Sequence, residues 1–306
     1  MPDTPRQPVL MLVRDPEKWG LERLGDHFDL RTEPDAGIRA VVTGVAEGID
    51  AATIDALPDL EIIAVCAVGY DSTDVAHARA RNVAVTNTPD ILTDDVADLA
   101  VALMLATARR VAAYDRFVRG GDWVRKGAPP LTRKVTGQRI GILGLGRIGS
   151  AIAKRAEPFA GEIAYHSRRP RTDVPYRYAP DLVQLAESVD ILIVATAGGK
   201  ETARLVDRAV LDALGPEGML INIARGSVVD EEALVSALSD GRLGSAGLDV
   251  FVDEPHVPEA LFAMENVVLL PHQGSATVQT RAAMGQLTID NLEAHFGGRP
   301  LLTPLW

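Results

Sequence analysis

The sequence predicts an α/β protein built from parallel sheets with helices on both faces. Short apolar runs alternate with helix-like stretches along the chain, which is typical of strands buried on both faces of a parallel sheet. The 306 residues exceed the usual size of one domain, so two domains are expected. Near the middle of the chain, one apolar run leads into a glycine-rich turn and then an amphipathic stretch.

The candidate strands are short and mostly apolar. In chain order they are predicted at residues 9–13, 41–43, 62–68, 83–85, the run before Gly144, 162–165, 191–194, 219–222, 246–250 and 267–270. Helices are predicted at residues 17–24, 94–110, 150–160 and 279–296. The helix at 94–110 is apolar almost all round, so we expect it to be buried between domains or between subunits.

The glycine-rich turn has the spacing Gly144-x-Gly146-x-x-Gly149, with Arg147 and Ile148 in the last gap. In a dinucleotide site the first glycine permits the turn, the second lets a pyrophosphate approach, and the third lets helix and strand pack closely. The N-terminus of the helix then favours a phosphate. Three glycines alone could mark a plain βα turn, but the strand and helix on either side favour a dinucleotide site.

The segment after the next predicted strand indicates which dinucleotide binds. An acidic residue about 20 positions on would bind the adenosine ribose hydroxyls, but the chain has Ser167, Arg168 and Arg169 there. A hydroxyl and two guanidiniums would bind a 2′-phosphate, which an acid would repel. The sequence therefore predicts NADP(H), with NAD(H) as a weaker alternative. A solvated basic loop is the other interpretation.

The composition excludes several classes of function. The net charge is −11, from 31 basic and 42 acidic side chains, so nonspecific nucleic-acid binding is not expected. The single cysteine, Cys66, lies in an apolar run and is predicted to be a core residue. With no apolar run near 18 residues and no recognisable signal peptide, we expect no membrane span and a cytoplasmic location.

Polar residues that follow predicted strands are the candidates for chemistry, because ligands of parallel sheets bind beyond the carboxyl ends of the strands. Arg225 follows one strand and could bind a carboxylate, although an interdomain salt bridge is an alternative role. A histidine beside a carboxylate keeps its proton to higher pH, so His272 with Glu254 could act as a general acid. His272 alone would more often be structural; its combination with Arg225, Glu254 and a dinucleotide site favours catalysis.

Metal binding is not predicted. No cluster of cysteine, histidine or carboxylate residues has metal-ligand spacing. Four of the other histidines lie in polar or helical surroundings and are predicted to be surface groups; they are His27, His77, His256 and His295.

These motifs together resemble the D-isomer-specific 2-hydroxyacid dehydrogenase family over essentially the whole chain. The matching stretches are residues 68–71, 87–89, 94–100, 144–149, 222–226, 248–251, 254–255, 271–272 and 274–277. The resemblance implies two doubly wound, Rossmann-like domains with an interdomain cleft. Residues 1–99 and 279–306 would form the discontinuous, flavodoxin-like substrate-binding domain, and residues 100–278 the dinucleotide-binding domain.

The resemblance also implies roles for individual residues. Arg225 would bind the carboxylate and keto oxygen of the substrate, and His272 would be the acid/base, oriented by Glu254. The nicotinamide amide would be held near Ala224 and Asp249, and the substrate carboxylate by backbone N–H groups of Val68 and Gly69. Thr196, which follows a strand beside the glycine-rich turn, completes the set of cofactor-binding candidates.

The variable positions narrow the expected substrate. The segment 165–170 resembles the NADPH-using glyoxylate/hydroxypyruvate and hydroxyphenylpyruvate reductases of the family. Residues 195–199 and Gln273 differ from common family patterns near the expected cleft, so the identity of the keto acid stays open. We expect reduction of small 2-keto acids such as glyoxylate and hydroxypyruvate to D-2-hydroxy acids, with an aromatic keto acid as the alternative. A dinucleotide-sensing corepressor is a further alternative.

The resemblance also implies the oligomeric state. Family members are usually dimers, so we expect a homodimer.

Overall fold

The computed structural model describes residues 6–306, and they divide into two compact units. Unit 1 comprises the described residues up to Leu92 together with Ser275–Trp306, and unit 2 is Thr93–Gly274. The units therefore divide at 92/93 and 274/275, whereas the sequence analysis placed the domain boundaries at 99/100 and 278/279. The shift at the first boundary arises because all of helix α4 (Thr93–Ala108) belongs to unit 2.

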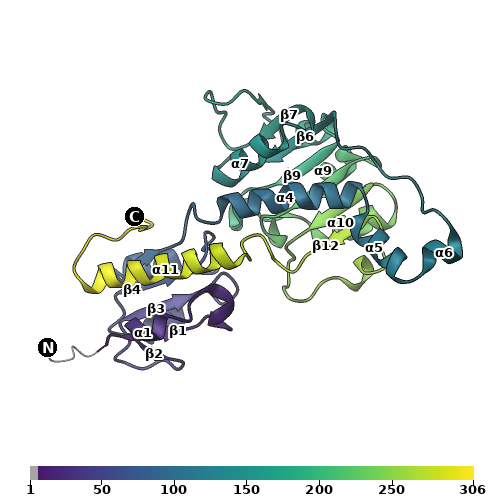
Figure 1. Ribbon diagram of the computed structural model, residues 1–306. Coiled ribbons are helices and arrows are strands. Elements are labelled where there is room, and N and C mark those ends of the chain that lie inside the picture. Colours follow the sequence, from purple (N-terminus) through teal and green to yellow (C-terminus); the bar gives the residue numbers. More distant parts are fainter. Residues whose placement is uncertain (1–5) are drawn as a thin grey trace. The chain divides into compact units, whose positions relative to one another are not determined.

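Unit 1 is a five-stranded parallel sheet in the order β2-β1-β3-β4-β5, which is the flavodoxin-like order (Figure 1). The strands are β1 (Pro8–Met11), β2 (Asp29–Arg31), β3 (Ala40–Thr43), β4 (Ile62–Val65) and β5 (Ala84–Thr86). The helices are η1 (Pro16–Trp19), α1 (Leu24–His27), α2 (Ala51–Asp55), α3 (Val75–Ala80) and the long α11 (Val278–Phe296). Residues of β3 and β4 are buried throughout, as expected for central strands of a covered parallel sheet.

Unit 2 is a seven-stranded parallel sheet in the order β12-β11-β10-β9-β6-β7-β8. The strands are β6 (Gln138–Leu143), β7 (Ala160–His166), β8 (Arg177–Tyr178), β9 (Ile191–Val194), β10 (Met219–Asn222), β11 (Ser245–Leu248) and β12 (Val267–Leu269). From β6 the chain runs outward through β7 and β8, then returns and runs the other way from β9. The ends of β6 and β9 therefore form the switch point at which open α/β sheets bind ligands.

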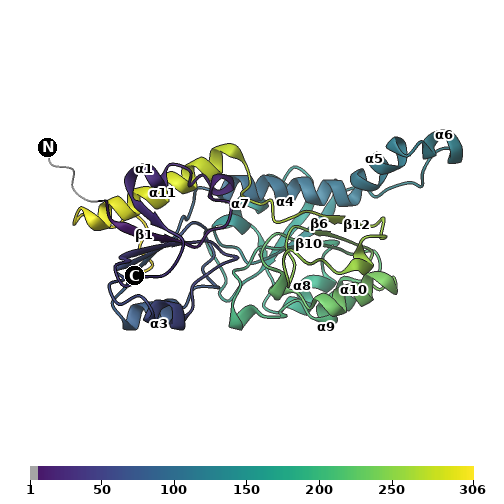
Figure 2. The ribbon, with the colours of Figure 1, turned by 90° about the horizontal axis from the view of Figure 1, so that it is seen from below.

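Helices cover both faces of the second sheet. Helices α4 and α7 (Arg147–Ala156) lie on one face, and α8 (Leu182–Glu187), α9 (Arg208–Leu214) and α10 (Glu231–Ser239) lie on the other (Figure 2). The doubly wound parallel architecture predicted for both domains is thus confirmed. Short 3₁₀ turns complete the unit: η2 (Lys200–Thr202), η3 (Gly226–Val228) and η4 (Glu259–Leu261).

One face of helix α4 packs within its own unit. Its buried residues lie against α7 and against β10, β11 and β12. Gly247 of β11 makes this close packing possible, because a β-carbon there would stand 2.8 Å from Leu103 Cγ and 2.6 Å from Thr107 Oγ1. The apolar character of this face follows from its packing on α7 and the sheet.

The segment at 17–24 corrects an expectation. Instead of one helix it forms η1, a turn at Gly20 and then α1. Gly20 has φ 70°, and a β-carbon there would stand 2.1 Å from the carbonyl oxygen of Arg281 in α11. The close approach of α11 therefore requires the break. The short edge strands β2 and β8 were not predicted, since neither is an apolar run.

Two short helices, α5 (Val111–Arg119) and α6 (Asp122–Lys126), extend away from the sheet of unit 2 (Figures 1 and 2). Neither helix contains a buried residue. Several of their apolar side chains, and one in the segment that follows, are exposed: Val111, Val118, Trp123, Val124 and Leu131. We call this segment, residues 111–131, the α5–α6 arm. In residues 6–306 no helix is long and apolar enough to cross a membrane.

Candidate active site

The glycine-rich turn lies at the switch point of the unit 2 sheet, between β6 and α7. Gly144 has φ 92°, and a β-carbon there would stand 2.7 Å from the Cα of Thr196. A β-carbon on Gly149 would stand 1.9 Å from the carbonyl oxygen of Gly144, whereas one on Gly146 would meet no protein atom within 4 Å. The first and third glycines therefore serve protein packing, and the second borders open space.

The start of α7 is suited to a phosphate. Gly146 is its N-cap residue, and no side chain caps the helix there. The backbone N–H groups of a first helical turn have no partners within the helix, and the helix dipole favours negative charge at that end. The open space beside Gly146 and this uncapped helix start fit the pyrophosphate of a dinucleotide. Arg147 and Ile148, the next two candidates, form the first turn of α7.

The loop after β7 carries the three residues predicted to select NADP(H). The side chain of Arg168 is 92% exposed, and its Nη1 lies 3.6 Å from Glu201 Oε2 in an exposed ion pair that contributes little stability. Arg169 is also exposed. The Ser167 hydroxyl donates to the carbonyl oxygen of Arg169 at 2.7 Å, which curls the loop. The guanidiniums of Arg168 and Arg169 therefore lie in solvent beyond the end of β7, the strand next to β6.

Arg225 follows β10 in a loop that is organised by Asn222. The Asn222 side chain donates from Nδ2 to the Arg225 carbonyl at 3.0 Å and accepts from the Ala224 N–H at 3.1 Å. Asn222 is buried, so these bonds hold the loop from inside the sheet. Asn222 was not among the predicted site residues, although a polar residue at the end of an apolar strand is a signal for a role.

Gly226 lets the Arg225 loop pack against the loop that carries Glu254. A β-carbon on Gly226 would stand 1.9 Å from the carbonyl carbon of Phe251. The Arg225 guanidinium donates from Nη1 to the Ala224 carbonyl at 2.7 Å, and its positive charge acts on Glu254. Arg225 and Glu254 thus belong to one electrostatic cluster.

Asp249 joins the ends of β11 and β12. Its carboxylate accepts from the backbone N–H of Gln273 at 2.6 Å and of Gly274 at 2.9 Å, and its carbonyl oxygen accepts from the His272 N–H at 2.8 Å. Burial raises the pKa of Asp249, and the two N–H donors and the nearby His272 offset part of that rise. The side chain expected to hold the nicotinamide amide is therefore also the anchor of the His272 turn.

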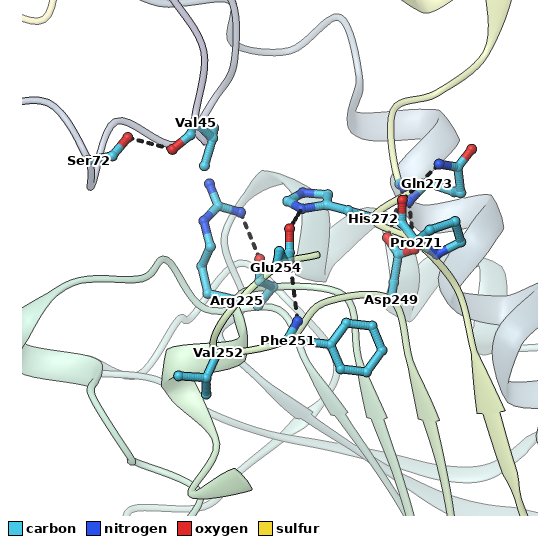
Figure 3. Close-up of polar contacts among 12 residues, drawn as sticks. Val45, Ser72, Arg225, Asp249, Phe251, Val252, Glu254, Pro271, His272 and Gln273 are labelled. Carbon is cyan, nitrogen blue, oxygen red and sulfur yellow. Dashed lines mark hydrogen bonds and ion pairs between the residues drawn. The ribbon is translucent and has the colours of Figure 1, made fainter. Parts of the chain in front are cut away.

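His272 and Glu254 form a direct pair (Figure 3). Nδ1 of His272 lies 2.7 Å from Glu254 Oε2, and Glu254 Oε1 accepts from the Phe251 N–H at 3.0 Å. The carboxylate is thus fixed on one side and orients the imidazole on the other. The two side chains are about one-third exposed, 36% for His272 and 33% for Glu254, so the pair is open to solvent.

The charge state of Glu254 is set by its neighbours. Burial alone would raise the pKa of Glu254, but the hydrogen bond and charge of His272, the Phe251 N–H and the charge of Arg225 together lower the pKa below the usual glutamate range. Glu254 therefore stays ionised at pH values where a free glutamate would begin to take up a proton.

The remaining candidates lie at other strand ends. Thr196 follows β9 and contacts Gly144 through its backbone. Val68 and Gly69 follow β4 of unit 1, where the Asn87 side chain donates to the Val68 carbonyl at 2.9 Å. Across residues 6–306, no group of three or more histidine, cysteine, aspartate or glutamate residues is arranged to hold a metal ion.

Comparisons with known proteins agree with this arrangement. The family model "D-isomer specific 2-hydroxyacid dehydrogenase, NAD binding domain" matches residues 101–274. The glyoxylate/hydroxypyruvate reductase A of Arabidopsis thaliana is 55% identical over 268 residues, covering 88% of this chain and 85% of that protein. The hydroxyphenylpyruvate reductase of Plectranthus scutellarioides is 56% identical over 287 residues, covering 94% and 90%.

Solved structures agree as well. The NADPH-dependent glyoxylate/hydroxypyruvate reductase of Sinorhizobium meliloti, in complex with NADP and malonate, superposes with a TM-score of 0.92 at 46% identity, covering 98% of this chain and 97% of that one. The chain therefore belongs to the D-isomer-specific 2-hydroxyacid dehydrogenase family of oxidoreductases, as its motifs predicted.

The glycine geometry gives a test of the cofactor site. We expect Gly149→Ala to lower the free energy of unfolding by roughly 1–3 kcal/mol, because its β-carbon overlaps the Gly144 carbonyl. Gly146→Ala should fold with near-normal stability and still lose dinucleotide affinity, since its β-carbon enters only the open space. Urea unfolding and calorimetric titration with NADP⁺ measure the two effects. Normal affinity in Gly146→Ala would contradict this placement of the pyrophosphate.

Proposed function

We propose that the protein is an NADPH-dependent reductase of small 2-keto acids, with glyoxylate and hydroxypyruvate as its first candidate substrates. The observation that carries the proposal is the fixed His272–Glu254 pair, which acts within the same electrostatic cluster as Arg225 at the strand ends of the dinucleotide-binding unit. Relatives named glyoxylate/hydroxypyruvate reductases support the substrate class.

The cofactor proposal rests on the two loops that follow β6 and β7. The open space beside Gly146 would take the pyrophosphate, and Ser167, Arg168 and Arg169 would bind the 2′-phosphate of NADPH. Thr196, Ala224 and Asp249 are further proposed contacts of the bound cofactor. NADH would bind more weakly, since the exposed guanidiniums would lack their phosphate partner.

In the proposed reaction, bound NADPH supplies the hydride. The Arg225 guanidinium would bind the carboxylate and keto oxygen of the substrate, with the backbone N–H groups of Val68 and Gly69 as further carboxylate donors. Because Nδ1 of His272 faces Glu254, its Nε2 is the nitrogen that would donate the proton to the keto oxygen. Glu254 would stabilise the protonated imidazole before that transfer.

An aromatic 2-keto acid is the second candidate substrate. The observation that favours it is the 56% identity to a hydroxyphenylpyruvate reductase, which is as high as the identity to the glyoxylate/hydroxypyruvate reductase. The chemistry at Arg225 and His272 would be the same for both acids, so the size of the acid accepted would distinguish them.

A steady-state panel tests substrate and cofactor together. It pairs glyoxylate, hydroxypyruvate, pyruvate, phenylpyruvate and hydroxyphenylpyruvate with NADPH and with NADH. We expect the highest kcat/KM for a small acid with NADPH. Replacing Arg168 and Arg169 together by alanine should lower kcat/KM with NADPH about tenfold or more while that with NADH changes little, because charge-assisted phosphate contacts are lost.

Other outcomes of the panel have definite meanings. A preference for NADH would refute the cofactor proposal. Turnover restricted to aromatic acids would favour the second candidate, and no turnover with any acid would favour a dinucleotide-sensing corepressor. Equal weakening of both cofactors in the double variant would indicate disruption of the loop.

The His272–Glu254 pair predicts a distinct pH behaviour. His272→Ala should lower turnover by roughly 10²–10⁴, the usual size of a general-acid contribution. Glu254→Gln should also lower kcat/KM, because the imidazole loses the carboxylate that orients it. At acid pH, Glu254 of the wild type stays ionised below the ordinary glutamate range because its pKa is lowered, so its pair with His272 persists there. At still lower pH the carboxylate takes up a proton and the ion pair is lost.

The measurement is the pH profile of kcat/KM for ketoacid reduction by the wild type and both variants. Near-normal turnover in His272→Ala would show that another group donates the proton. An unchanged kcat/KM in Glu254→Gln would show that the carboxylate does not orient the imidazole.

The proposal includes a homodimer joined through the α5–α6 arm. In the arm, Trp123 is 60% exposed and Val124 is 94% exposed, and neither α5 nor α6 contains a buried residue. Exposed apolar side chains gathered in one segment are typical of a protein interface. A second copy of the chain is the proposed partner, in keeping with the family resemblance.

Sedimentation velocity tests the dimer. We expect the wild type to sediment as a dimer and the variant with both Trp123→Asp and Val124→Asp to sediment as a monomer, because charges would have to be buried. Phe262→Asp, at a residue that is 61% exposed outside the arm, is the matched control and should stay dimeric. A monomeric wild type would refute the proposal.

A further inference from the structure

Arg171 fastens the basic loop after β7 to the glycine-rich turn. Its Nη1 donates to the carbonyl oxygen of Leu145 at 2.9 Å and to the hydroxyl of Ser150 at 2.8 Å. Leu145 stands between Gly144 and Gly146, and Ser150 lies near the start of α7. One side chain therefore connects the loop proposed to hold the pyrophosphate of the cofactor with the loop proposed to hold its 2′-phosphate.

The backbone of Arg171 is held from the opposite side by Tyr165. The Tyr165 hydroxyl accepts from the Arg171 N–H at 2.7 Å and donates to the Arg171 carbonyl at 3.2 Å. Tyr165 is fully buried in β7, beside the ring of Tyr178 at 5.4 Å between centroids. The Tyr178 hydroxyl in turn donates to the Ser167 carbonyl at 3.2 Å. The loop is thus fixed to the sheet at Ser167 and at Arg171, on either side of Arg168 and Arg169.

The guanidinium of Arg171 has little capacity left for a ligand. Nε donates to Asp173 Oδ1 at 3.0 Å and Nη2 to Asp173 Oδ2, while Nη1 makes the two bonds to Leu145 and Ser150. A guanidinium has five N–H donors, so only one is unused. Arg168 and Arg169, by contrast, are exposed to solvent. Within this loop, Arg171 is therefore bound to the protein, whereas Arg168 and Arg169 face solvent.

We propose that Arg171 is a positioning residue that sets the NADPH preference by holding Ser167, Arg168 and Arg169 at a fixed distance from the glycine-rich turn. This inference rests on the proposed function. A 2′-phosphate and a pyrophosphate belong to one molecule, so the two loops must bind them at a fixed separation. A loop that is held in place before binding loses less conformational freedom when the cofactor binds, so the affinity is higher. This gain in affinity applies only to the cofactor that carries the 2′-phosphate.

The experiment measures binding without catalysis. Calorimetric titrations of the full-length protein compare 2′-phospho-ADP-ribose with ADP-ribose, which share the pyrophosphate and differ in the 2′-phosphate. In Arg171→Met and Tyr165→Phe, the Kd for 2′-phospho-ADP-ribose should rise about tenfold, while that for ADP-ribose changes by less than about threefold. Tyr165→Phe keeps the buried ring and removes only the hydroxyl, so it tests the same idea with an intact core.

Two further variants separate position from charge. Arg171→Lys keeps the positive charge but cannot hold Leu145, Ser150 and Asp173 together, so we expect it to lose most of the 2′-phosphate preference. Arg177→Met removes an arginine of β8 that pairs with Glu162 instead of the loop, and it should bind both probes like the wild type.

The outcomes test the positioning role of Arg171 separately from the proposed NADPH preference. Full 2′-phosphate preference in Arg171→Lys would assign the effect to charge, and an unchanged Kd ratio in Arg171→Met and Tyr165→Phe would exclude positioning; either result overturns the inference. Equal binding of the two probes by the wild type would instead overturn the proposed NADPH preference.

Discussion

The buried carboxylate of Asp249 is the interaction on which the candidate active site depends. A buried carboxylate is costly unless donors surround it, and here two consecutive backbone N–H groups, of Gln273 and Gly274, supply them. That requirement fixes the path of the chain after β12 against the end of β11. The position of His272, and through it the contact with Glu254, follows from this one constraint.

The same principle recurs around the unit 2 sheet: polar side chains at strand ends hold the loops that carry the candidate functional groups. Asn222 organises the Arg225 loop through two hydrogen bonds, and Tyr165 organises the loop after β7 in the same way. Because all strands run parallel, these organised loops lie at one edge of the sheet. The fold thereby gathers at this edge groups that lie far apart in the sequence, between residues 144 and 272.

Much of this organisation could be predicted from the sequence. Apolar strands such as Ile191–Val194 were located correctly, because nearly every residue is apolar in a parallel strand that is buried on both faces. The Gly144 turn was predicted from the strand and helix on either side of it, and the pairing of Glu254 with His272 from their combination with Arg225 and a dinucleotide site. The break of the helix near Gly20 was not predicted, since its cause is the distant helix α11.

The supporting residues were harder to predict for the same reason. Nothing local in the sequence says that Arg171 reaches Leu145, or that a carboxylate at 249 accepts N–H groups 24 and 25 residues further on. Such contacts depend on which loops the sheet order brings together. Sequence patterns identify the residues that carry chemistry, while the structure identifies the residues that hold them.

His272 has φ 53°, in the left-handed region, where a β-carbon is crowded by the backbone at a cost of roughly 1–2 kcal/mol. Glycine avoids that cost, and asparagine tolerates the same conformation better than most residues. The position that carries the proposed proton donor is therefore one where a smaller, inert side chain suits the backbone better. Removing the chemistry there need not weaken the fold, which makes this position a natural place to create an inactive protein that retains intact substrate for structural work.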